Sequence, residues 1–99
     1  MTLYVGMESP HQLVVVVTRS DSTPDLSGTT SADIVCTRSD GTTVTWSSQS
    51  VSSVSASGYT VTRTLASGDL PSAGGYRLYT VANPSGWESA NVTFTVERR

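Results

Sequence analysis

The sequence predicts an all-β fold, a single antiparallel β-sandwich of about seven strands that occupies residues 1–99. Val and Thr alternate along several short segments, which is typical of strands with one buried and one solvated face. Turn-forming residues separate these segments at nearly regular intervals. A chain of 99 residues is long enough for one hydrophobic core and too short for a second domain.

The first part of the chain predicts two strands and a polar connection. Residues 2–5 are expected to form a short edge strand, because Pro10 soon afterwards cannot donate to a ladder. Residues 11–18 contain four consecutive Val, which indicates a strand buried on much of both faces. A short buried helix is the alternative, and the β-branched run disfavours it. Residues 19–28 are polar, with Leu26 as their apolar anchor.

The middle of the chain contains the clearest local hairpin. Residues 32–38 and 43–47 are the expected strands, and the Asp-Gly sequence within 39–42 supplies the tight turn. The side chains expected to face the core are Ile34, Cys36, Val44 and Trp46. Residues 47–58 are rich in Ser with few apolar positions, so we expect a loop or a poorly specified edge there.

The last part of the chain is organised around a corner at residues 65–79, where Gly and Pro end one strand and the next begins. Strands are expected at 59–65, 75–82 and 87–97, with a turn at 83–86. In the last strand, the side chains expected to face the core are Val92, Phe94 and Val96.

Composition excludes several classes of partner. Charged residues make up 14% of the chain, the net charge is -2 and Lys is absent, so we expect no binding to nucleic acid or to a membrane. Cys36 is the single cysteine and cannot form an internal disulfide. The amino terminus lacks the basic and long apolar regions of a signal peptide, and the run 13–17 is too short to span a bilayer. A mature secreted domain with a restored Met would look the same.

No pattern in the chain predicts catalysis, a cofactor or a metal site. His11 is the single histidine, without metal-ligating partners at a suitable spacing, and no serine lies in a nucleophile elbow. The glycines at 74–75 precede a predicted strand and not the helix that a phosphate loop requires. The carboxylates lie in or beside turns, where capping is their ordinary role: Asp21, Asp25, Asp33, Asp40 and Asp69.

Exposed aromatic and arginine side chains are the better functional candidates. Arg77 and Tyr79 alternate with core-facing residues, so we expect them on the outer face, with Trp87 just after the following turn. These residue types are enriched at interface hot spots. Tyr4 joins them because its edge strand, like the weak edge at 51–57, offers unpaired backbone for docking. Alternatively, Trp87 folds over the open end of the sandwich and Tyr79 pairs across strands.

Three features of the sequence resemble those of an immunoglobulin-like domain. Cys36 lies in the middle of a strand, Trp46 follows on the next strand, and residues 74–78 are similar to the tyrosine corner, with Tyr76 as its tyrosine. The family's second cysteine falls at Leu78. The resemblance therefore implies that the disulfide between the sheets is absent and that Cys36 is a small buried apolar residue.

A second resemblance covers more of the chain. The segments 2–6, 24–29, 38–41, 68–70 and 75–76 resemble the small immunoglobulin-like modules of tailed-bacteriophage structural proteins, such as the amino-terminal module of siphophage baseplate upper proteins. The resemblance implies a non-enzymatic structural or accessory protein of the virion, located in the tail, baseplate, adaptor or capsid surface. It would bind other virion proteins in a symmetric multi-copy assembly. The alternative is a carbohydrate-binding or adhesion module that recognises a glycan of the host surface.

Overall fold

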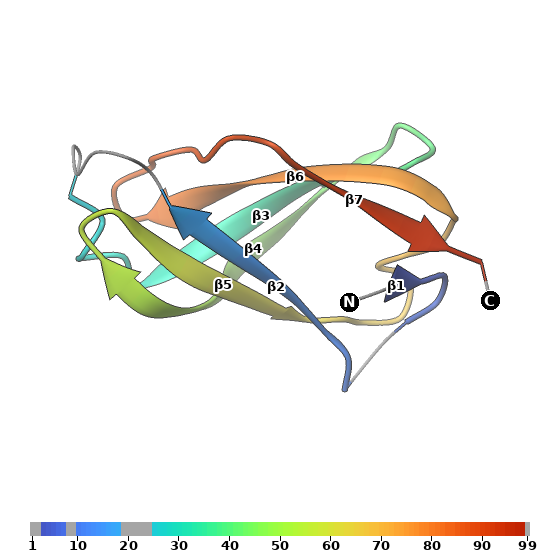
Figure 1. Cartoon of the computed structure of the whole chain (residues 1–99), viewed down its shortest axis with the longest axis horizontal. Helices are drawn as coiled ribbons and strands as arrows, with labels where there is room; N and C mark the ends of the chain where they lie inside the picture. Colours follow the sequence, from blue (N-terminus) through green and yellow to red (C-terminus); the bar gives the residue numbers. More distant parts are fainter. Residues whose placement is uncertain (1–2, 8–9, 19–24, 99) are drawn as a thin grey trace.

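The computed structural model describes residues 3–7, 10–18 and 25–98, and the regular structure within them is entirely β-strand (Figure 1). The seven strands are β1 (Leu3–Tyr4), β2 (Gln12–Thr18), β3 (Ser31–Thr37), β4 (Thr43–Ser55), β5 (Gly58–Thr64), β6 (Gly74–Asn83) and β7 (Val92–Glu97). They form one sheet in the order β1-β7-β6-β3-β4-β5-β2, which curls into a half-barrel. The all-β class and the number of strands are confirmed.

The sheet is mixed and not purely antiparallel. β1 runs parallel to β7, with Leu3 beside Val96 and Tyr4 beside Glu97, while the other strand pairs are antiparallel. Parallel neighbours need a long connection, and here almost the whole chain separates the two strands. The prediction of an edge strand near the amino terminus is confirmed at β1, while Thr2 lies outside the described residues.

β4 joins the two halves of the half-barrel. Its first part pairs with β3 and its second part with β5. Ser48 and Ser53 adopt positive φ angles of 53° and 52°, so the strand departs from a regular pleat as it passes from one partner to the other. The prediction of a loop at 47–58 was therefore wrong, because pairing such as that of Val51 with Val61 imposes a strand on a sequence with no strand pattern. Residues 51–57 are also not a sheet edge in the strand order.

The curl brings β5 opposite β6, although two strands separate them in the sheet order. Tyr59 Oη and Thr80 Oγ1 lie 2.6 Å apart in a buried hydrogen bond between these strands. Burial raises the pKa of the Tyr59 hydroxyl above its usual value. In Figure 1, β2 and β5 cross in front of β3. Apolar side chains from both halves of the sheet form one core.

β2 is the second edge of the sheet, and the prediction that both of its faces are buried was wrong. Leu13, Val15 and Val17 are buried, whereas Val14 is 52% and Val16 is 68% exposed. A run of Val shows no contrast between its two faces, so the sequence could not reveal that only one face has a layer packed on it.

The corner between β5 and β6 is held by side-chain hydrogen bonds to the backbone. Tyr76 Oη donates to the carbonyl of Ser72 at 2.7 Å. The Ala66 amide donates to Asp69 Oδ2 at 2.8 Å, so this carboxylate caps its turn as predicted. Leu70 is fully buried beneath the corner.

The last strand begins later than predicted. The turn at 83–86 is confirmed, with the Gly86 amide donating to the carbonyl of Ala82 at 2.7 Å. Residues 87–91 add only an isolated bridge between Val81 and Glu88 before β7 starts. Val92 was expected in the core but is 41% exposed.

The connection before β3 is described from residue 25 onward, and the part of the predicted connection at 19–24 lies outside the described residues. Asp25 Oδ1 accepts a hydrogen bond from the Ser27 amide at 2.9 Å, and Leu26 is buried. The anchoring role predicted for Leu26 is confirmed. The described part of the chain contains no helix long and apolar enough to cross a lipid bilayer.

Candidate interaction face

The outward sides of β3, β4, β6 and β7 form one continuous surface, because the strand registers place side chains of the same direction next to one another. Thr37, Arg77 and Thr93 form one row across three strands, and Tyr79 lies beside Val35 in the next. We call this surface the outer threonine face. Its members are Val35, Thr37, Thr43, Thr45, Arg77, Tyr79, Thr93 and Thr95.

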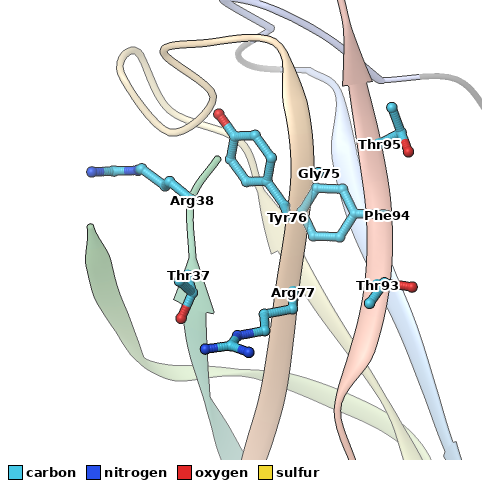
Figure 2. Close-up of a pocket in the computed structure, with 8 residues that line it drawn as sticks. All are labelled: Thr37, Arg38, Gly75, Tyr76, Arg77, Thr93, Phe94 and Thr95. Atoms are coloured by element: carbon cyan, nitrogen blue, oxygen red, sulfur yellow. The ribbon is translucent and has the colours of Figure 1, made fainter. Parts of the chain in front are cut away.

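A depression of about 410 Å³ lies at one end of this face, between the ends of β3, β6 and β7 (Figure 2). Gly75 pairs with Thr95 and presents no side chain, and a Cβ placed on it would meet no atom within 4 Å. The missing side chain keeps the surface open there. The residues lining the depression are Thr37, Arg38, Gly75, Tyr76, Arg77, Thr93, Phe94 and Thr95.

Two arginines are among the residues that line the depression, and the lining includes no carboxylate. Arg77 is exposed, and no carboxylate among the described residues forms an ion pair with it. Arg38 Nη2 donates to the carbonyl of Gly68 at 3.3 Å, while its Nε is buried without a hydrogen-bond partner. Guanidinium groups bind carboxylates through charge-assisted hydrogen bonds, and nearby threonine hydroxyls can add neutral ones. The depression is therefore suited to an anionic oxygen group.

Two aromatic residues, Tyr76 and Phe94, lie beneath the depression, with their rings on the core side of β6 and β7. Tyr76 and Phe94 are register partners on β6 and β7, with ring centroids 5.3 Å apart and planes tilted by 33°. The Tyr76 hydroxyl is already engaged at the corner, so its position is fixed. Phe94 is only partly buried and packs against the core.

Three of the four predicted interface residues share this side of the sheet. Arg77 and Tyr79 belong to the outer threonine face, and Tyr4 points the same way at the β1 margin, because its neighbour Leu3 is buried. Trp87 does not join them. Its carbonyl accepts a hydrogen bond from the amide of the buried Ala82, and its side chain packs against the core.

The four residues predicted to have structural roles are all buried: Cys36, Trp46, Tyr76 and Leu78. Two of them are not arranged as the resemblance to an immunoglobulin-like domain implied. Cys36 and Leu78 are direct register partners on the neighbouring strands β3 and β6. They lie side by side in one layer and do not face each other across the core, as the disulfide positions of the family would. Burial raises the pKa of the Cys36 thiol to about 11.

Trp46 lies next to an inward-facing ion pair that the sequence did not reveal. The Arg63 guanidinium carbon is 4.7 Å from the centroid of the Trp46 ring, and its Nη2 is 3.0 Å from Asp69 Oδ2. The cation thus contacts both an aromatic ring and a carboxylate at the corner. These contacts fix the position of the corner relative to β4 and β5.

Sequence reasoning also missed Arg38, Gly75 and the threonine rows. The Thr-Val-Thr sequence at 43–45 and the Thr-Phe-Thr sequence at 93–95 are the signals that mark outward-facing positions. These local patterns do not tell which strands are neighbours. The row that combines Thr37 with Arg77 depends on the pairing of β3 with β6, which are far apart in the sequence.

The other polar candidates have local structural contacts. His11 is exposed, and Asp40 accepts hydrogen bonds from the Thr42 amide and hydroxyl, which lower the pKa of its carboxyl group. Asp33 Oδ1 accepts from the Ser48 amide and from Asn83 Nδ2. Within residues 3–7, 10–18 and 25–98, no three His, Cys, Asp or Glu side chains are grouped so that they could hold a metal ion. Comparisons with protein-family models, curated proteins and solved structures gave no match.

Proposed function

We propose that this protein is a non-enzymatic structural or accessory component of a tailed-bacteriophage particle, and that it binds neighbouring virion proteins through the outer threonine face. The observation that carries the proposal is the open depression on that face, which Arg77 and three threonines line without any carboxylate.

The pairing of the strands supports an immunoglobulin-like sandwich as the finer description of the fold. β2, β5 and the second part of β4 pair in the order of strands B, E and D of that family, and β3, β6 and β7 in the order of C, F and G. The hydrogen bond of Tyr76 at the start of β6 agrees with the tyrosine corner of strand F. In this assignment Cys36 belongs to strand C, so Leu78 is not its partner across the sheets.

The outer threonine face has the features of a protein contact. Tyr and Arg are enriched at interface hot spots, and both residue types are present on this face. Arg77 can take a carboxylate from that neighbour, since it has none among the described residues of its own chain. A domain of this size offers a modest contact area, so repetition on a symmetric particle would supply avidity.

The geometry gives less support to a carbohydrate-binding module. In that alternative, Tyr79 and Trp87 are the side chains that would stack on sugar. Tyr79 lies on the outer side of β6, whereas Trp87 packs against the core on the inner side. The two rings therefore do not form one stacking platform.

Purified particles provide the test. Phage particles from infected cells that express the tagged chain are separated on a density gradient, and the chain is quantified relative to the major capsid protein. We expect a fixed copy number that matches a symmetry of the particle. Recovery of the chain only as free protein, with none in the particle fractions, would refute the proposal.

Variants of the outer threonine face then test whether the contact with the particle is made through that face. Arg77→Ala removes the exposed charge, and Gly75→Val fills the depression without changing the charge, so both are expected to reduce incorporation. Arg98→Ala is the matched control, because Arg98 is also exposed but lies beyond β7. Equal incorporation of all four chains would show that a different surface makes the contact.

A further inference from the structure

β2 is a full-length edge strand, and among the described residues only one of its two edges is paired. Its seven residues pair with β5, and the described part of the chain supplies no partner for its opposite edge. β1, at the other end of the sheet, has two residues. Long edges with unpaired backbone groups are sites where another strand can add to a sheet.

The register identifies which backbone groups are free. The Leu65 amide donates to the carbonyl of His11, and hydrogen-bonded pairs alternate along antiparallel strands. Continued along the register, this pattern directs the amides and carbonyls of Leu13, Val15 and Val17 toward β5. The groups of the alternating residues point away from the sheet: Gln12, Val14, Val16 and Thr18.

This edge is complementary to itself. If two copies of β2 run antiparallel about a two-fold axis at Val15, Val14 lies opposite Val16 of the other copy, and Gln12 opposite Thr18. These are the residues whose backbone groups are free, so each opposed pair can exchange two hydrogen bonds. No residue from 12 to 18 is charged, so the pairing brings no like charges together.

The exposed valines favour the same arrangement. Val14 and Val16 are the most exposed large apolar side chains of the described chain, at 52% and 68%. In the antiparallel pair, the four valines of two copies meet as cross-strand neighbours and shield one another from water. The outward backbone groups of β2 and its exposed valines thus favour the same partner, a second copy of β2, in the same register.

We propose that β2 is a homodimerisation strand, which pairs antiparallel with β2 of a second copy of this chain in the register that places Val15 on the two-fold axis. The contact is isologous and joins two sheets into one continuous sheet. It uses neither Arg77 nor Tyr79, so the outer threonine face stays available in the dimer.

Sedimentation equilibrium of the purified chain over a wide concentration range tests the proposal. We expect a monomer–dimer equilibrium. Val14→Lys/Val16→Lys places Lys opposite Lys twice in the pair and is expected to weaken dimerisation by about tenfold or more. Val14→Lys/Val16→Glu places Lys opposite Glu of the other copy and is expected to retain the dimer. Both sites are exposed, so in dilute monomer the thermal unfolding of the variants should match that of the parent chain.

Amide hydrogen exchange gives an independent readout. In dilute monomer, the amides of Val14 and Val16 should exchange fast while that of Val15 is protected by β5. At concentrations where the dimer forms, Val14 and Val16 should become protected as well. A parent chain that stays monomeric at millimolar concentration overturns the proposal. So does a dimer that the Lys/Lys variant leaves intact, or one in which Val14 and Val16 still exchange fast.

Discussion

Tyr59 and Thr80 join hydroxyl to hydroxyl inside the core, 2.6 Å apart, between strands that are not neighbours in the sheet. Tyr59→Phe or Thr80→Val alone leaves the other hydroxyl buried without this partner, so each should lower the free energy of unfolding by about 1–2 kcal/mol. The double variant should cost clearly less than the sum, because no unpaired hydroxyl remains. Urea denaturation of the four chains measures the coupling, and simple additivity would contradict it.

Tyr76→Phe tests the corner. The change removes the hydroxyl that donates to the Ser72 carbonyl, and we expect a loss of about 1 kcal/mol in the free energy of unfolding. Tyr79→Phe is the control, since Tyr79 lies on the outer face of the same strand. A melting curve of Tyr76→Phe that matches that of the control would show that this hydrogen bond does not stabilise the corner.

Stability should fall at alkaline pH because of Cys36. Burial raises the pKa of its thiol from 9.0 to about 11, so the unfolded chain loses this proton before the folded chain does. The contribution of Cys36 is complete below pH 9 and is lost as the pH rises from about 9 to about 11.

A single group changes the free energy of unfolding by at most about 1.4 kcal/mol per pH unit. Cys36→Ala should therefore flatten the decline between these pH values, although the cavity lowers stability at every pH. Some decline remains, because burial also raises the pKa of Tyr59. Denaturation curves that fall equally steeply with and without Cys36 would disprove the assignment.

Gly58 is required where β5 starts. A Cβ at this position would overlap the carbonyl oxygen of Val17, so Gly58→Ala must displace β2 or β5. We expect a loss of about 2 kcal/mol or more, in the range for changes that force the backbone to move. Gly75→Ala is the control, because a Cβ there meets nothing within 4 Å. Thermal unfolding of the two variants should differ clearly, and equal melting temperatures would contradict this account.

Local features of the fold could be predicted from the sequence, since they depend on neighbours in the chain. The alternation that buries Ile34 and Cys36, and the turn at Asp40-Gly41, are determined within a few residues. The second part of β4 could not be predicted, because a run of serines becomes a strand only by pairing with β5. Likewise, Val14 and Val16 are exposed because β2 is an edge, which depends on the whole strand order.

For the candidate site, too, local features could be predicted from the sequence and long-range ones could not. Alternation alone placed Arg77 and Tyr79 on one outward side of β6. It could not place Trp87, whose direction depends on a backbone contact with Ala82 across a turn. The depression needs Arg38 from the end of β3, Gly75 from β6 and Phe94 from β7, and only long-range register brings these residues together.

The parallel pairing of β1 with β7 determines how the protein would carry mechanical load. A force that pulls on the chain before Leu3 and after Glu97 drives these two strands in opposite directions along their length. The hydrogen bonds between them are then sheared together, whereas a hairpin pulled from its open end separates one bond at a time. Tension applied through the two ends of the domain would thus fall first on a two-residue strand, whose release leaves the strands from β2 to β7 paired.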